Sequence, residues 1–206
     1  MRRLVLAPHM DDESLGCGGL LAKFPTECTV VTMTDSGAQR RAEFDAAMAI
    51  LGVAHARHLG FPDTGLGAQM SEVVKTLDDL FAELRPDEVY LPFPSLHQDH
   101  IAAYEAGMRA SRASMSAQHW FPPTVLVYDI AVYDVNLHPS DLRWNVFEPL
   151  TQEQADAKAA ACAAYVSENP GGPHPMNSIK ELCAAVGSMR LLAYAEQYAL
   201  VRKVRG

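Results

Sequence analysis

The stretch Leu4-Val5-Leu6-Ala7-Pro8-His9-Met10-Asp11-Asp12-Glu13-Ser14-Leu15-Gly16-Cys17-Gly18-Gly19 decides the fold of this 206-residue chain. It begins as a short apolar run of strand length, breaks at Pro8, and continues into glycines that open a helix-like run. A strand that feeds a polar turn and then a helix is the first unit of an α/β sheet. Ligands bind at the carboxyl ends of the strands in such sheets, so the polar turn is a candidate site.

The polar turn carries one histidine and three acidic residues: His9, Asp11, Asp12 and Glu13. A structural turn needs one Asp or Asn to bond its own backbone, and three acids beside a histidine exceed that need. Like charges this close repel one another, and a bound cation is the usual compensation. The turn therefore predicts half of a metal site.

The glycines that follow the turn do not form a dinucleotide fingerprint. They stand at 16, 18 and 19, which is not the spacing G-x-G-x-x-G, and the acids before them would repel a phosphate. We interpret these glycines as positions where the first helix packs closely on the sheet.

Strands and helices alternate along the rest of the chain. Apolar and β-branched runs predict strands over residues 28–33, 57–61, 88–92 and 124–130. Helical spacing and caps predict helices over 43–51, 71–85, 101–114, 151–165 and 179–186, while 196–204 fits a strand or a helix. This alternation predicts one domain over residues 1–206, an α/β fold with a doubly wound, mostly parallel sheet.

A second polar motif, Ser95-Leu96-His97-Gln98-Asp99-His100, follows the strand predicted at 88–92. Catalytic zinc takes three protein ligands from His and carboxylate side chains and keeps one position open for water. A His-x-Asp-His motif can give one His to the metal and leave the other, oriented by the Asp, for proton transfer. Each motif alone has an ordinary explanation, a solvated acidic turn or surface histidines. Their occurrence at two equivalent strand ends favours a metal site.

Composition narrows the class of protein. A formal net charge of −8 argues against nucleic acid or an anionic membrane surface as a partner, because both need a basic footprint. No apolar run approaches the roughly 18–20 residues that a membrane-spanning helix needs. The basic start before a short apolar run resembles a signal peptide only superficially, so we expect a cytoplasmic protein. The four cysteines form no C-x-x-C pair, and we expect buried, reduced thiols.

Three charged residues are candidates for substrate binding: Arg40, Arg41 and Asp63. They follow predicted strands, where a polar ligand can meet them, although salt bridges or caps explain such residues more often. The sequence does not say which of the two arginines faces a substrate. Specificity is expected in the loops around residues 35–41, 62–70, 115–123 and 132–142. Five further histidines have no partnered spacing and are interpreted as structural or surface residues: His55, His58, His119, His138 and His174.

The two polar motifs together resemble those of the LmbE-like (PIG-L-like) zinc-dependent N-deacetylases, A-H-P-D-D-E and H-P-D-H. The likeness extends through residues 40–52, 62–63, 158–167 and 195–198. Met10 and Gln98 replace the two motif prolines, which supply no functional side chain, so turn rigidity is expected to change rather than chemistry. Glu168 stands where many members carry Gln, a difference that bears on substrate choice.

The resemblance implies a Rossmann-like fold with helices on both faces of the sheet, and a role for each motif residue. The zinc ligands that it implies are His9, Asp12 and His100. Asp11 resembles the general base, His97 the general acid or oxyanion-stabilising group, and Asp99 the residue that orients His97. Many members are homo-oligomers, so a homo-oligomer is one expectation for this chain.

The function implied is removal of an acyl group, most often acetyl, from an N-acetylglucosamine-type amino sugar or its conjugate. Three alternatives stay open: a metal-binding protein of the same fold without amidase activity, an amidase that acts on a non-sugar amide, and a metal phosphoesterase. Phosphoesterases often use two metals, and only one site's worth of ligands is evident here. A serine hydrolase is disfavoured because the chain has no G-x-S-x-G elbow.

Overall fold

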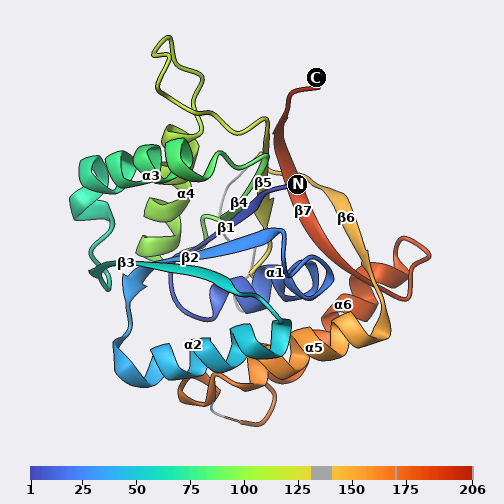
Figure 1. Cartoon of the computed structure of the whole chain (residues 1–206). Coiled ribbons are helices and arrows are strands. Elements are labelled where there is room, and N and C mark those ends of the chain that lie inside the picture. The colour runs from blue at the N-terminus through green and yellow to red at the C-terminus, as the bar shows by residue number, and fades with distance from the viewer. Residues whose placement is uncertain (131–140, 170, 206) are drawn as a thin grey trace.

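A computed structural model describes residues 1–130, 141–169 and 171–205 of the chain. Within these residues the strands form one seven-stranded sheet in the order β3-β2-β1-β4-β5-β7-β6 (Figure 1). The strands are β1 (Arg3–Ala7), β2 (Cys28–Asp35), β3 (His55–Pro62), β4 (Glu88–Pro92), β5 (Thr124–Tyr128), β6 (Trp144–Leu150) and β7 (Tyr194–Lys203). Strands β1 to β5 pair in parallel, whereas β7 is antiparallel to both β5 and β6.

Helices cover both faces of this sheet (Figure 1). They are α1 (Asp12–Lys23), α2 (Gly37–Leu51), α3 (Met70–Leu84), α4 (Gln98–Ala110), α5 (Gln152–Ala163) and α6 (Ile179–Ser188). The described residues also contain three short 3₁₀ turns: η1 (Gly67–Gln69), η2 (Val166–Glu168) and η3 (Pro175–Asn177). One apolar core lies between the sheet and α3 and α4, and a second lies under α1, α2 and α5. The predicted fold class, a doubly wound and mostly parallel sheet with helices on both faces, is confirmed.

Several predicted boundaries were wrong. Helix α2 begins at Gly37 rather than at 43, and α4 begins at Gln98, so the second motif lies at the start of a helix rather than in a loop. The tail is a strand, β7. Strand β6 was missed because it is a half-exposed edge strand that contains Glu148 and Pro149, and such a strand has a weak apolar signal.

The glycines of α1 pack closely, as the sequence predicted. A Cβ on Gly16 would lie 2.1 Å from the ring of Tyr128 on β5, and one on Gly19 would lie 2.3 Å from Leu150 on β6. The absence of side chains at these positions lets the backbone of α1 approach the sheet.

A buried ion pair between Lys158 and Glu196 holds helix α1 against strand β7. Glu196 on β7 accepts hydrogen bonds from Lys158 Nζ at 2.6 Å and from the backbone N–H groups of Gly19 and Leu20 at 2.7 Å. Tyr198 donates a further hydrogen bond to the same carboxylate at 2.7 Å. Each charge is therefore compensated inside the protein, as burial of charged groups requires.

Two other expectations concern thiols and membranes. All four cysteines are free and buried, as predicted. In the part of the chain that the structure describes, no helix combines the length and the apolar character that crossing a bilayer requires.

The close approach of α1 gives a stability prediction. Gly16→Ala should lower the free energy of unfolding by about 1–3 kcal/mol, because the new methyl group overlaps the Tyr128 ring. Gly67→Ala is the matched control, since nothing lies within 4 Å of a Cβ there and Gly67 is exposed. Urea denaturation of both variants measures the difference, and equal stability of the two would contradict this account of α1.

Candidate active site

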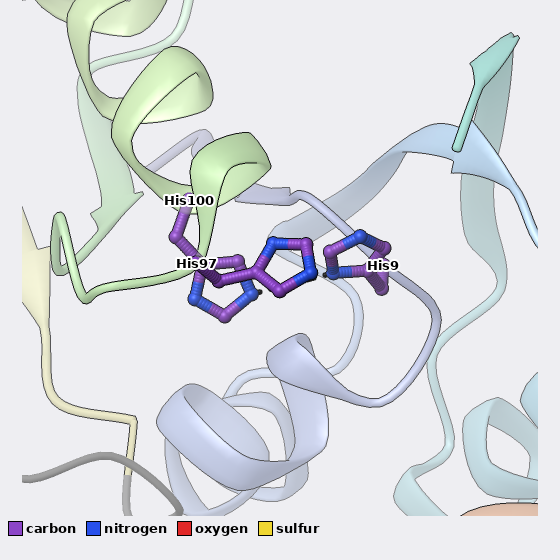
Figure 2. Close-up of side chains that lie close together, drawn as sticks. All are labelled: His9, His97 and His100. Atoms are coloured by element: carbon purple, nitrogen blue, oxygen red, sulfur yellow. Dashed lines mark hydrogen bonds between the residues drawn. The ribbon is translucent and has the colours of Figure 1, made fainter. Parts of the chain in front are cut away.

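The two polar motifs meet at the carboxyl edge of the parallel sheet. Strands β1 and β4 are neighbours, so the turn after Ala7 and the segment after Pro92 emerge side by side. The carbonyl of Pro8 accepts hydrogen bonds from the backbone and the hydroxyl of Thr34, which ties the turn to β2. Figure 2 shows the result, in which the rings of His9, His97 and His100 lie close together between the turn and the start of α4.

Three ligand atoms form a nearly equilateral triangle at this point. His9 Nδ1 lies 3.4 Å from Asp12 Oδ2, His100 Nε2 lies 3.3 Å from the same oxygen, and the two ring nitrogens are 3.3 Å apart. A tetrahedral zinc ion with ligands at about 2.0–2.1 Å has ligand–ligand separations of about 3.3–3.4 Å. The triangle therefore has the dimensions of one face of a zinc site.

The outward-facing nitrogens of both histidines have partners of their own. His9 Nε2 lies 3.2 Å from Asp63 Oδ1 and 3.4 Å from Asp99 Oδ2. His100 Nδ1 lies 2.9 Å from the hydroxyl of Ser95. Such contacts on the second ring nitrogen fix the tautomer and the orientation of a metal-binding histidine.

The carboxylates around the triangle shift the pKa values of the groups that form it. Burial alone would lower the pKa of His9, but the carboxylates of Asp12, Asp11 and Asp63 raise it to about 9. Burial would raise the pKa of Asp12, yet His100 and His9 lower it well below its usual range. The pKa of Asp11 is raised by burial and by Asp12. The site thus favours an additional positive charge, which a bound cation supplies.

Asp11 is held in an unusual backbone conformation at the beginning of α1. Its φ angle of 152° is one that residues other than glycine rarely adopt. Glu13 Oε2 accepts the N–H of Asp11 at 3.1 Å, and Arg40 Nη1 donates to Asp11 Oδ2 at 3.0 Å and to the carbonyl of Met10 at 2.7 Å. Backbone and carboxylate of Asp11 are therefore both fixed.

Glu13 does not share the site with the other acids of the motif. Its side chain is fully buried and accepts hydrogen bonds from the hydroxyls of Ser14 at 2.7 Å and Tyr165 at 2.5 Å. Burial raises its pKa despite these donors. The sequence placed Glu13 in the metal half-site, whereas the structure makes it the support of the Asp11 backbone.

Asp99 also differs from its predicted role. Its carboxylate accepts the backbone N–H groups of Thr64 at 2.6 Å and Leu66 at 3.2 Å and faces His9, not His97. His97 is instead oriented by the backbone, because the N–H of Asp99 donates to His97 Nδ1 at 3.2 Å. The carboxylate of Asp99 therefore fixes the loop after β3, and the residue bonds to His97 through its backbone N–H.

The triangle and Asp11 lie in a cavity of about 390 Å³. Of the predicted substrate-binding residues, Arg40 and Asp63 line it and Arg41 does not. The guanidinium of Arg41 is half-exposed and lies 4.0 Å from Asp35, since successive residues of a helix point about 100° apart.

Sequence reasoning missed part of this cavity. The lining residues for which no role was predicted are Leu15, Ile130, His174 and Met176, whereas Ser36 and Glu168 had been linked to specificity. His174 was interpreted as structural or surface, and its Gly- and Pro-rich surroundings give no signal for a site.

Of the loops expected to carry specificity, two contribute to the cavity through Ser36, Arg40 and Asp63. The expectation for residues 115–123 is wrong: this loop precedes β5 and so lies at the opposite edge of the sheet, where Trp120 bonds the carbonyl of Pro86. Residues 132–140, also expected to carry specificity, fall outside the described residues.

Comparison with known proteins gives consistent matches. The model of a protein family described as PIG-L: GlcNAc-PI de-N-acetylase matches residues 4–111, just over half of the chain. An Escherichia coli protein described as uncharacterized deacetylase YaiS is 29% identical over 179 residues, which cover 80% of this chain and 90% of that protein.

Two further matches extend over most of the chain. A 1D-myo-inositol 2-acetamido-2-deoxy-alpha-D-glucopyranoside deacetylase from Nocardioides sp. is 26% identical over 227 residues, covering 84% of this chain and 72% of that protein. The crystal structure of the conserved protein TT1542 from Thermus thermophilus superposes with a TM-score of 0.81 at 26% identity, covering 100% of this chain and 97% of that one.

The support of Asp11 by Glu13 can be tested through Tyr165. Tyr165→Phe removes one donor from a buried carboxylate and should lower the free energy of unfolding by about 1–3 kcal/mol. Tyr104→Phe is the control, because its hydroxyl has no hydrogen-bond partner among the described residues. Urea denaturation measures both variants. A Tyr165→Phe protein as stable as the control would contradict the importance of this hydrogen bond.

Proposed function

This chain belongs to the PIG-L (GlcNAc-PI de-N-acetylase) family, and we propose that it is a zinc-dependent deacetylase of N-acetylglucosamine-type amino sugars or their conjugates. The observation that carries the proposal is the triangle of His9, Asp12 and His100 with the fixed carboxylate of Asp11 beside it. The Nocardioides relative, described as a deacetylase of a 2-acetamido-2-deoxy-glucopyranoside, supports the substrate class.

Zinc is the metal that suits the donor set of two imidazoles and one carboxylate. His9, Asp12 and His100 would hold it, with Asp63, Asp99 and Ser95 behind the two rings. Bound there, the ion supplies Lewis acidity, which polarises an acyl carbonyl and lowers the pKa of water toward ~7.

Asp11 is the proposed general base. An amide is a poor electrophile, so water must lose a proton as it attacks the carbonyl carbon. The carboxylate of Asp11 lines the cavity, and its contact with Arg40 sets its direction. Burial and the neighbouring Asp12 raise its pKa, which makes it a stronger proton acceptor than an exposed carboxylate.

His97 is the proposed stabiliser of the tetrahedral oxyanion that forms when water attacks. Its Nδ1 accepts the N–H of Asp99, so a neutral ring carries its proton on Nε2 and can donate it in a hydrogen bond. Burial and the neighbouring His9 and His100 lower the pKa of His97. A neutral donor at His97 leaves Asp11, protonated by the water, to protonate the departing amine.

A metal-binding protein without amidase activity is the competing interpretation. Metal binding alone requires neither Asp11 nor His97 in the cavity, whereas acyl transfer to water uses both. Their positions next to the triangle therefore favour an enzyme.

The metal assignment predicts a specific loss. Protein purified with zinc offered should hold one equivalent, and His100→Ala should lose most of it because one corner of the triangle is removed. His55→Ala is the control, since His55 is exposed at the start of β3 and outside the cavity. Elemental analysis of the folded variants decides the question. Full zinc retention in His100→Ala would remove His100 from the ligand set.

The base assignment predicts that adjacent carboxylates behave differently. The wild type should release acetate from one or more N-acetylglucosamine glycosides in a panel. Asp11→Asn should keep its zinc and lower kcat by about 10²–10⁴. Asp12→Ala should lose zinc and activity together.

All three proteins are compared by acetate release, zinc content and far-ultraviolet circular dichroism, which distinguish loss of the base from loss of zinc and from loss of the fold. Undiminished kcat in Asp11→Asn would exclude Asp11 as the base. Acetate release from no member of the panel would contradict the deacetylase proposal.

A further inference from the structure

Arg40 is the one arginine or lysine among the described residues that line the cavity, and each nitrogen of its guanidinium has a partner within the protein. Nη1 donates to Asp11 and to the carbonyl of Met10, Nε donates to the hydroxyl of Ser167 at 3.2 Å, and Nη2 pairs with Glu168. Each of the three nitrogens thus already has an acceptor. Arg40, predicted as a substrate-binding residue, is held by the protein itself.

Glu168 supplies the outermost of these contacts. It ends η2, its side chain is 44% exposed, and it lines the cavity, so a substrate that enters the cavity meets this carboxylate. The hydroxyl and backbone N–H of Ser167 bond to Glu43 at 2.6 and 3.0 Å, which holds η2 against α2. The position of Glu168 over Arg40 is therefore fixed by the fold.

Two backbone donors at the starts of the neighbouring helices are occupied as well. The N–H of Gly37, at the beginning of α2, is bonded to Asp35 at 3.1 Å. The N–H of Asp99, in the first turn of α4, is bonded to His97. The cavity lining includes four carboxylates, Asp11, Asp12, Asp63 and Glu168, against one guanidinium and four imidazoles.

We propose that Glu168 is a specificity-determining residue: by engaging Arg40 it makes the site select uncharged N-acylated sugars over phosphorylated ones. This inference rests on the proposed function. A phosphate group requires free N–H donors and a positive field, and Glu168 both removes the Arg40 donor and adds a negative charge at the entrance. An uncharged glycoside needs only hydrogen bonds, which carboxylates at the rim can accept from sugar hydroxyls.

The experiment compares binding of two reaction products, which are not turned over. Methyl glucosaminide and glucosamine 1-phosphate share the amine, so their difference isolates the phosphate. Isothermal titration calorimetry on the zinc-loaded protein gives both Kd values for the wild type, Glu168→Gln and Asp45→Asn. The glutamine amide can still accept a hydrogen bond from Arg40, so only the charge is removed. Asp45→Asn removes the same charge on the exposed face of α2, outside the cavity.

We expect the wild type to bind methyl glucosaminide at least about tenfold more tightly than glucosamine 1-phosphate. Glu168→Gln should bind glucosamine 1-phosphate about tenfold more tightly than the wild type does and leave the Kd of methyl glucosaminide unchanged. Asp45→Asn should change neither value.

Three results would overturn the inference: equal affinity of the wild type for both ligands, an unchanged preference in Glu168→Gln, or an equal gain in Asp45→Asn. Acetate release on the glycoside panel is a separate readout. If no acetate is released while the binding pattern is as expected, the deacetylase activity is refuted and the charge selection by Glu168 still holds.

Discussion

Three consecutive carboxylates, of which Asp12 and Glu13 are buried and Asp11 is largely so, can lie together only when each has its own compensation, and this constraint organises the structure. Asp12 faces two imidazoles, Asp11 faces the guanidinium of Arg40, and Glu13 accepts the hydroxyl of Tyr165. Without these partners, the repulsion between neighbouring charges and the cost of taking them out of water would disrupt the turn. His100 comes from α4, Arg40 from α2 and Tyr165 from the segment after α5, so three distant parts of the chain contact this turn.

The sheet makes that convergence possible. With β1 between β2 and β4, the segments that follow all three strands leave the same edge of the sheet, which brings Arg40 and His100 to opposite sides of the turn. Helix α1 must then start directly at the sheet edge, and its glycines allow it to run close against β5 and β6. The buried pair of Lys158 and Glu196 fixes the middle of that helix, so the position of its first residues depends on packing far from the cavity.

Sequence reasoning succeeded where the signal is local. A buried strand followed by His9 and two acids, and a second strand followed by His97 and His100, predicted the correct fold class and named residues that the structure brings together at one edge of the sheet. It failed where tertiary contacts decide. The carboxylate of Asp99 accepts two backbone N–H groups of the loop after β3, and nothing near Asp99 in the sequence indicates these donors. His174 reaches the cavity from a loop that has no helical or strand period, so no pattern could assign it.

The different roles proposed for Asp11 and Asp12 follow from one backbone feature. Asp11 stands outside the helix with a φ of 152°, whereas Asp12 is the first residue of α1, so their side chains leave the chain in different directions. Asp12 turns to the two imidazoles, and the direction of Asp11 is set by Arg40. The strained conformation, maintained by the bond from the Asp11 N–H to Glu13, therefore separates the proposed metal ligand from the proposed base within two consecutive residues.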